Sequence, residues 1–354
     1  MVEGTVLVTG AAGGLQGKTG RRVTELLRER GVPVRAMVRT PDDRAEYLRG
    51  LGAEVVVGDF LDFQSIEKVV DGISTVYFAY PVQPGLLDAT VNMAVAARNA
   101  GVKRLIDMVM LVSTPDAPTP RLRENYLSEQ VFEWAGIGAA HVRATVFFEN
   151  IRSLANATIA SGVFMAPFGD DSTVIPLAAG DDVARVAAAV LTAADVPPGD
   201  SYSVIGQVLT VKEIVAAIAR GLGREVAYQD VSDEVWAEAA SSRINAHAVA
   251  HLSKLWATFR TRPVHYQVTD TIEKLGGRKP KTLAEFVAEE KLTFPAQGES
   301  SKGSGKRTVR RQVGRGARPY RSQGARGSKR FGLTPTICFP VLALVSARIW
   351  HAET

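Results

Sequence analysis

Five glycines lie within the eleven residues GAAGGLQGKTG, from Gly10 to Gly20, directly after the apolar run 6–8. A glycine-rich turn between a first strand and a helix can present backbone amides and a helix N-terminus to phosphate groups. Such turns usually span about six residues from first to last glycine, so this one is enlarged. The chemistry it suggests is dinucleotide binding, although many glycine-rich turns bind nothing.

The residues after the loop indicate where the extra length falls. Gly20 and Gly31 are about three helical turns apart, and an apolar stripe of Val23, Leu26 and Leu27 lies between them. We expect Gly10 to make the tight turn and Gly20 to pack the helix start against the first strand. The insertion then enlarges the middle of the cradle. The expected phosphate-binding glycines are Gly10, Gly13, Gly14, Gly17 and Gly20.

The end of the next predicted strand, in VRAMVRTPDDR, carries Arg39 followed by Thr40. Sites that prefer NAD usually place Asp or Glu here, where it accepts hydrogen bonds from the ribose hydroxyls. A guanidinium instead matches a ribose 2′-phosphate in charge and geometry. The pattern therefore favours NADP(H) over NAD(H); the alternative is that Arg39 is a solvated residue at a strand end.

Asp59, in VVVGDFLD, follows the third predicted strand. At that position its side chain can face the adenine of a bound dinucleotide. It can equally cap a helix that begins near Gln64. The sequence leaves these two interpretations open.

Short β-branched runs alternate with amphipathic helical stretches through the first half of the chain. This alternation is typical of a doubly wound parallel sheet of the Rossmann type, covered by helices on both faces. The expected strands are 5–9, 34–38, 54–57, 75–79, 104–109 and 141–147.

The rhythm changes after Phe148, where a stretch rich in Gly and Pro precedes further helices. Thr210 with Glu213, and Thr282 with Glu285, have the spacing of capping boxes at helix starts. We expect an NADP-binding Rossmann core over 1–150 and a smaller, mostly helical C-terminal lobe over 151–296. A helix and a strand near 181–206 return to the core.

The remaining segment, 297–354, is predicted to be a disordered basic tail. Twelve of the 42 Lys and Arg but only two of the 37 Asp and Glu lie in it, which leaves residues 1–296 with 30 basic and 35 acidic side chains. Its composition of Gly, Ser, Arg and Lys gives little apolar surface to bury. The charge of this tail would suit nucleic acid, but Tyr320 is the only aromatic among its basic residues, so we do not expect nucleic-acid binding through it.

Cysteine usage and hydropathy exclude several classes of protein. Cys338 is the only cysteine, so residues 1–296 form no disulfide, zinc-thiolate site or cysteine nucleophile. The apolar stretch 337–345 is interrupted by Pro340 and is shorter than the ~20 residues that a bilayer span requires. With no leader visible at the N-terminus, we expect a cytoplasmic protein without a membrane span. The oligomeric state is not indicated.

Taken in order, eight segments of residues 1 to about 295 resemble the NmrA-like family, atypical relatives of the short-chain dehydrogenases. The family includes NADPH-dependent quinone reductases and non-catalytic redox-sensing regulators. The resemblance implies a Rossmann core, a small C-terminal lobe and a cleft between them. The segments are VLVTGAAGG…TG, VRAMVRTPDDR, GAEVVVGDFLD, YFAYPVQPGLLDA, NAGVKRLIDM, NYLSEQVFEWAGI, HVRATVFFENI and TDTIEKLGGRKPKTLAEFV.

By this resemblance the coenzyme would be lined by Gly10, Gly13, Gly20, Arg39, Asp59 and the turn Ala79-Tyr80-Pro81. The Ser-Tyr-Lys pattern of the wider superfamily does not carry over. Tyr126 is followed four residues later by the neutral Gln130, and Val109 stands where a serine is frequent. A phenol with a pKa near 10 needs an adjacent cation to exchange protons at neutral pH. Closer members often have His or Lys where this chain has Asn125.

Hydride transfer to a quinone-like or other small conjugated carbonyl acceptor needs little acid catalysis, because the reduced oxygen can take its proton from water. Tyr80 and Tyr126 are our candidate catalytic residues, in the sense of orienting such an acceptor. Phe147 and Phe148 are further candidates for the pocket wall, although an aromatic on a strand is more often core. The alternative function is a regulatory protein that senses NADP(H) and binds a protein partner without turnover.

Two histidines, His247 and His251, are spaced i, i+4 on a predicted helix and could face one metal ion. No acid or third histidine lies at metalloprotease spacing, so we expect a surface pair and no metal site. His141, which opens a buried strand, is expected to be a hydrogen-bonded structural residue.

Overall fold

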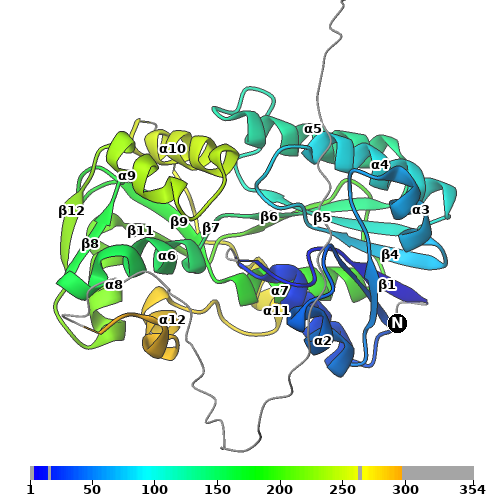
Figure 1. The fold of residues 1–354 in the computed structure, drawn as a ribbon, viewed down its shortest axis with the longest axis horizontal. Helices are drawn as coiled ribbons and strands as arrows, with labels where there is room; N and C mark the ends of the chain where they lie inside the picture. The colour runs from blue at the N-terminus through cyan, green and yellow to red at the C-terminus, as the bar shows by residue number, and fades with distance from the viewer. Residues whose placement is uncertain (1–3, 15–16, 262–264, 297–354) are drawn as a thin grey trace, which may run out of the picture. The chain divides into compact units, whose positions relative to one another are not determined.

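The computed structural model describes residues 4–14, 17–261 and 265–296 (Figure 1). Its central sheet has seven strands: β1 (Thr5–Val8), β2 (Val34–Val38), β3 (Glu54–Val57), β4 (Ile73–Phe78), β5 (Arg104–Met110), β6 (Ala139–Ala144) and β10 (Ser201–Val204). Every pairing is parallel, in the order β10-β6-β5-β4-β1-β2-β3. The order reverses at β1, as in a doubly wound sheet, so the predicted fold class is confirmed.

Helices cover both faces of this sheet, as Figure 1 shows. One face carries α1 (Thr19–Glu29), α2 (Asp43–Gly50), α7 (Gly180–Thr192) and α11 (Thr271–Gly276). The other carries α3 (Phe63–Val70), α4 (Leu86–Asn99) and α5 (Pro120–Trp134). Side chains alternate along each strand, so on β4 Tyr77 enters the first core while Val76 and Phe78 enter the second.

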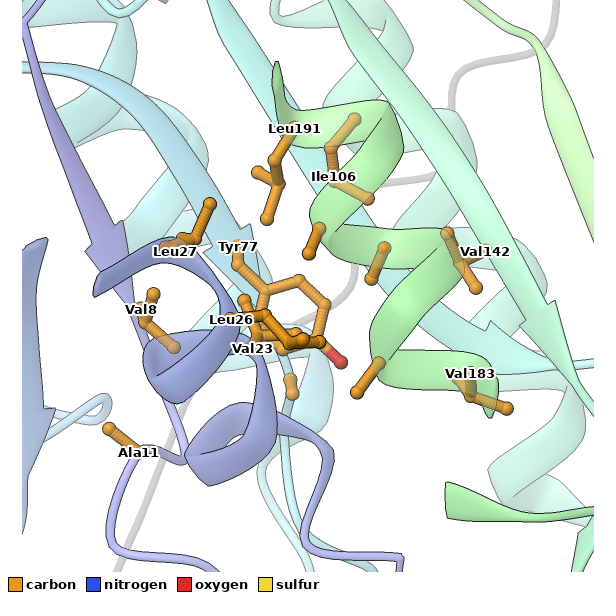
Figure 2. Close-up of a cluster of buried hydrophobic side chains, with 14 of the residues drawn as sticks. Val8, Ala11, Val23, Leu26, Leu27, Tyr77, Ile106, Val142, Val183 and Leu191 are labelled. Atoms are coloured by element: carbon orange, nitrogen blue, oxygen red, sulfur yellow. The ribbon is translucent and has the colours of Figure 1, made fainter. Parts of the chain in front are cut away.

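The apolar stripe of α1 packs beside α7 over the sheet (Figure 2). Val23 and Leu27 are fully buried there, together with Tyr77 of β4. The hydroxyl of Tyr77 forms a 3.0 Å hydrogen bond with Thr19 at the start of α1. This packing fixes the position at which α1 begins, and with it the end of the glycine loop.

The C-terminal lobe contains more β-structure than its sequence predicted. The stretch expected to be irregular contains two strands, β8 (Val163–Ala166) and β9 (Val174–Ala178). Together with β7 (Val146–Phe147), β11 (Gln207–Thr210) and β12 (Ala227–Asp230), they form two small sheets with the strand orders β11-β9-β7 and β12-β8. The helical elements are α6 (Phe148–Thr158), α8 (Val211–Leu222), α9 (Asp233–Ser241), α10 (Ala246–Thr261), α12 (Leu283–Glu289) and the 3₁₀ turns Ile159–Ser161 and Lys291–Thr293. These strands are short, and β9 carries Pro176, which hides its strand signal.

Local capping signals were read correctly. Thr210 and Thr282 each accept a hydrogen bond from the backbone amide of the Glu three residues later, and each Glu carboxylate accepts one from the backbone amide of the Thr, at the starts of α8 and α12. After the first strands of the lobe, α7 packs on the first core and β10 pairs with β6 at the edge of the seven-stranded sheet. Across the described residues, no helix is long and apolar enough to cross a membrane. The predicted disordered tail lies outside the described residues.

Candidate functional site

A cavity of about 660 Å³ opens at the carboxyl ends of the parallel strands. Residues that follow β1, β2, β3, β4 and β5 form one part of its wall, and the lobe forms another. This is the crevice in which doubly wound folds bind ligands, and its volume falls in the range of ~300–1,000 Å³ typical of such sites. The lobe contributes Arg243, Ile244, Asn245, Ala248, His251, Leu252, Leu255 and Phe259.

The glycine loop lies along this cavity. Gly10 and Gly13 adopt left-handed backbone conformations, with φ of 63° and 70°, and the Gly13 amide donates to the Gly10 carbonyl over 3.0 Å. A Cβ on Gly20 would lie 2.5 Å from the Thr9 carbonyl oxygen, so only glycine lets α1 begin against β1, as the sequence predicted. Gly10, Gly13, Gly14 and Gly20 line the cavity, while residues 15–16 of the insertion lie outside the described part.

Gly17 does not line the cavity, contrary to expectation. A Cβ on Gly17 would lie 2.9 Å from the ring of Phe147, and a Cβ on Gly180 would lie 2.2 Å from the Gly17 carbonyl oxygen, so neither position accommodates a side chain. Gly17 therefore holds the loop against β7 and the start of α7. Its role in this structure is packing.

Arg39 and Thr40 are exposed at the end of β2 and line the cavity as expected. Within the described residues, Arg39 has no hydrogen-bond or ion-pair partner. A second arginine beside them, Arg44, was not singled out from the sequence. Its guanidinium donates to the Gly13 carbonyl over 3.1 Å and pairs with Asp42, the residue that caps α2. Arg44 thus connects the glycine loop to the end of β2.

Asp59 lines the cavity, and the helix-cap alternative for it is wrong. The N-cap of α3 is Asp62, whose carboxylate accepts from the amides of Gln64 and Ser65. The Asp59 carboxylate accepts from the amide of Leu61 over 3.0 Å, which fixes a tight turn after β3. One oxygen of Asp59 is thereby occupied in the turn.

The turn after β4 also lies on the cavity wall, with Ala79, Tyr80 and Pro81 all contributing. The amide of Ala79 donates to the Thr9 hydroxyl over 2.8 Å, which ties this turn to the end of β1. Tyr80 is only 4% exposed, and its hydroxyl donates to the Pro84 carbonyl over 2.7 Å. The Tyr80 ring can therefore shape the wall, while its hydroxyl is engaged in the turn.

The expectation for Tyr126 does not agree with the structure, in which its neighbour Asn125 lines the cavity instead. Successive residues of a helix point about 100° apart, so only one of the two can face the sheet edge. Asn125 is 2% exposed, and among the described residues its Oδ1 atom has no hydrogen-bond partner.

Arg121 and His251 are two further polar residues of the cavity wall, and the sequence predicted neither of them to lie there. Arg121 is 3% exposed and donates to the Tyr80 carbonyl over 2.9 Å, and burial lowers its pKa to about 10. His251 was expected at the surface, but it is 3% exposed, with Nδ1 3.0 Å from the Thr119 hydroxyl. Burial, and then the charge of Arg121, lower the pKa of His251 to about 3, so its ring is neutral at pH 7. Arg121, Asn125 and His251 are here called the polar corner.

The signal for Arg121 was present in the sequence. Thr119 and Pro120 have the N-cap and N1 pattern of a helix start, and the structure confirms Thr119 as the cap of α5. With the helix beginning at Pro120, Arg121 and Asn125 both lie in its first turns. Because they are four residues apart, their side chains lie on the same side of the helix.

Apolar side chains form most of the remaining wall. Phe147 is half-buried and lines the cavity, whereas Phe148 is fully buried in the lobe core and does not. Asp59 is the only carboxylic acid among the described lining residues. The described residues also contain no cluster of three or more His, Cys, Asp or Glu able to hold a metal ion. His141 is 1% exposed and its Nε2 lies 3.1 Å from Glu133, a structural role as expected.

Comparison with known proteins identifies the family of this chain and the reductases to which it is similar. The model of the NmrA-like family matches residues 2–287. The chain belongs to the NmrA-like family. It is 31% identical over 301 residues to the (4-alkanoyl-5-oxo-2,5-dihydrofuran-3-yl)methyl phosphate reductase of Streptomyces griseus, covering 82% of this chain and 99% of that protein. It is 28% identical over 298 residues to the NAD(P)H azoreductase of Xenophilus azovorans, again over 82% and 99%.

Solved structures of this family share the fold. The NADPH-dependent quinone oxidoreductase of Escherichia coli, in complex with NADPH, is similar with a TM-score of 0.69 and 26% identity, over 80% of this chain and 99% of that one. The negative transcriptional regulator NmrA is similar with a TM-score of 0.68 over 81% and 95%. At 19% sequence identity, this similarity shows a shared fold and nothing about function.

Proposed function

We propose that this chain is an NADPH-dependent reductase that transfers hydride directly to a quinone-like or other small conjugated carbonyl acceptor, without a Ser-Tyr-Lys triad. That it is an NAD(P)H-dependent oxidoreductase follows from its family and from reductase relatives that match nearly all of the described chain. The proposal concerns the acceptor and the coenzyme preference. One observation carries it: a continuous cavity leads from the glycine loop and Arg39 to the apolar wall of α10.

The residues present fit a nicotinamide dinucleotide. Gly10, Gly13 and Gly14 line the cavity and carry no side chain, so the backbone of the loop can approach a ligand closely. Gly20 lets the N-terminus of α1 lie at the end of the loop. Backbone amides and a helix N-terminus of this kind bind phosphates. The guanidinium of Arg39, which has no partner among the residues described, is available for a ribose 2′-phosphate. When bound, the coenzyme supplies the hydride.

The acceptor side of the cavity suits a flat conjugated molecule. Phe147, Leu252, Leu255 and Phe259 give it apolar walls that can hold a ring in one orientation. Neither the engaged hydroxyl of Tyr80 nor Asp59 is placed to act as a general acid there. This favours acceptors whose reduced oxygen takes its proton from water.

The test is NADPH oxidation, followed by absorbance, with a panel of quinones, azo dyes and conjugated carbonyl compounds. The proposal predicts turnover with at least one quinone or enone. Tight NADPH binding with no turnover across the panel would instead support the alternative of a coenzyme-sensing regulator with a protein partner, which the missing triad favours. Capture of such a partner only in the presence of coenzyme would then be the next measurement.

The coenzyme preference is tested by replacing Arg39 with Asp. Loss of the guanidinium should weaken NADP binding by roughly tenfold or more, because a hydrogen bond to a charged group contributes about 1.5–3 kcal/mol. NAD binding should be unchanged or tighter. Calorimetric titration with both dinucleotides measures this, and Lys212→Asp, an equal charge change away from the cavity, is the matched control. Equal effects on NADP and NAD would show that Arg39 does not contact the phosphate.

A further inference from the structure

The polar corner is the part of the cavity that coenzyme binding leaves unexplained. Arg121 and Asn125 come from α5, which covers the sheet face opposite α1, the helix that ends the glycine loop. His251 comes from α10 of the lobe and is tied to Thr119, the cap of α5. Each of the three is at least 97% buried and lines the cavity. They form a built polar site at the meeting of core and lobe.

Arg121 is a buried cation without a contacting counter-charge. No carboxylate of the described residues lies within 4.0 Å of its guanidinium, and its Nε and Nη1 atoms have no hydrogen-bond partner there. Glu124 on the same helix and Asp107 on β5 act on it only at longer range. Burial raises the pKa of Asp107 well above its ordinary value, and its Oδ2 atom accepts a hydrogen bond from the Ser128 hydroxyl over 3.1 Å.

The other two members of the corner also have unused hydrogen-bonding capacity. Among the described residues, neither Oδ1 of Asn125 nor Nε2 of His251 has a partner. An unsatisfied buried polar group costs ~1–3 kcal/mol, and more when it is charged. Oδ1 of Asn125 can only accept a hydrogen bond, whereas the Arg121 nitrogens can only donate and Nε2 of His251 can do either according to its tautomer, so this wall has unused donors for an anionic ligand.

The charge of the cavity wall defines the ligand further. Its described cations are Lys18, Arg39, Arg44, Arg121 and Arg243, against the single acid Asp59. Lys18, Arg39, Arg44 and Asp59 belong to the glycine loop and the ends of β2 and β3. The other side of the cavity presents Arg121 of α5, and Arg243 of the lobe at an exposed position, with no acid among its described residues. A neutral acceptor would leave Arg121 without a counter-charge in contact.

We propose that the acceptor carries a carboxylate and that the polar corner binds it, with Arg121 as the pairing cation. A single buried guanidinium matches the single charge of a carboxylate, and the NH₂ group of Asn125 and, in the tautomer that carries its proton there, Nε2 of the neutral His251 ring can donate to it. This assignment rests on the proposed function, because it names the class of acceptor for the same cavity. Arg121 is then the residue that determines specificity.

A binding test separates this inference from turnover. Calorimetry on the full chain saturated with NADP compares 2-naphthoate with the isosteric, neutral 2-naphthamide. We expect 2-naphthoate to bind at least tenfold more tightly, and Arg121→Met to remove that difference. Arg123→Met is the matched control, since Arg123 lies two residues along α5, donates to the Ala117 carbonyl and is not part of the cavity wall. Equal affinities for the two ligands would overturn the inference.

Two further measurements keep the outcome interpretable. NADPH affinity and the unfolding midpoint of Arg121→Met show whether the variant is folded; a loss of NADPH affinity as large as the loss of 2-naphthoate affinity would assign Arg121 to the coenzyme and overturn the inference. Asn125→Asp, which places a carboxylate one helical turn from Arg121, should reproduce the loss of 2-naphthoate binding in a chain that keeps the guanidinium.

A kinetic comparison tests the acceptor itself. A naphthoquinone with a propionate side chain should have a lower KM than its neutral methylamide, and Arg121→Met should remove that KM ratio. Turnover of both quinones with the same KM would overturn the inference and leave the reductase proposal standing. Arg121-dependent binding of 2-naphthoate with no turnover of either quinone or of any compound in the wider panel would support the carboxylate site and reject the reductase proposal.

Discussion

At Tyr80, the aromatic ring and the hydroxyl serve different parts of the structure. The ring packs edge-on against Phe60, with 5.2 Å between centroids, and lines the cavity. The hydroxyl donates to the Pro84 carbonyl and accepts from Gln83, both within the turn that leads to α4. A phenol held in this way positions the wall and is not available to donate a proton to an acceptor.

Tyr80→Phe tests this division of roles. Removing the hydroxyl leaves the Pro84 carbonyl without its donor, so the free energy of unfolding should fall by about 1 kcal/mol. The kcat for a quinone should change by less than about threefold, because loss of a general acid typically costs ~10²–10⁴-fold. Urea unfolding and NADPH oxidation measure the two effects, with Tyr47→Phe as a control distant from the turn. A hundredfold loss of kcat would identify Tyr80 as a proton donor and contradict this division of roles.

Among the elements, α6 and α7 meet beneath the glycine loop through one buried carboxyl group. Glu149, in the first turn of α6, accepts a hydrogen bond from the amide of Gly180, the first residue of α7, over 3.2 Å. Burial raises its pKa to about 7, against weaker opposing effects of backbone hydrogen bonds and the charge of Arg152. Glu290, paired with Arg152, acts in the same direction as burial.

This raised pKa makes a prediction for stability against pH. The unfolded chain loses the Glu149 proton near pH 4.5 while the folded chain keeps it to about pH 7, so this group lowers stability progressively between those values. Glu149→Gln keeps an acceptor for Gly180 and removes the titration. We expect the variant to be more stable than the parent by up to about 3 kcal/mol at pH 8, with the difference shrinking toward pH 5. Denaturant unfolding at both pH values measures it; a constant difference would contradict the assignment.

The sequence predicted features of helices and strands that have local signals, and it did not predict those that depend on tertiary packing. Gly20 and the capping boxes at Thr210 and Thr282 were predicted because their signals lie within a few residues of the structure they form. The orientation of a helix residue is not local: choosing Tyr126 over Asn125, or placing His251 at the surface, depends on what α5 and α10 pack against. Strands β8 and β12 pair across some sixty residues, and no local pattern in either specifies its partner.

At the scale of the whole molecule, a charged junction joins residues from opposite ends of the described chain. Asp181, at the start of α7, accepts from Arg22 of α1 over 2.7 Å and pairs with Arg278, which follows α11. Arg185 of α7 lies 3.4 Å away. Burial acts to raise the pKa of Asp181, but the hydrogen bond and charge of Arg22, with the charges of Arg278 and Arg185, hold it below its ordinary value. The junction thus fastens the helix that begins at the glycine loop to the returning segment.

Asp181→Asn should therefore destabilise the protein far more than the loss of an exposed ion pair. It removes one carboxylate from three guanidinium groups, of which that of Arg185 is buried, and we expect a loss of about 2–3 kcal/mol at pH 7. The control Glu29→Gln breaks an exposed pair with the same Arg22 and should cost less than about 1 kcal/mol.

Because the folded pKa of Asp181 is lowered, its contribution to the free energy of unfolding is complete above about pH 4 and is lost as the pH falls further. Denaturant unfolding of both variants at pH 7 and at about pH 3 measures this. An Asp181→Asn effect no larger than that of Glu29→Gln would show that apolar packing alone holds α1, α7 and α11 together.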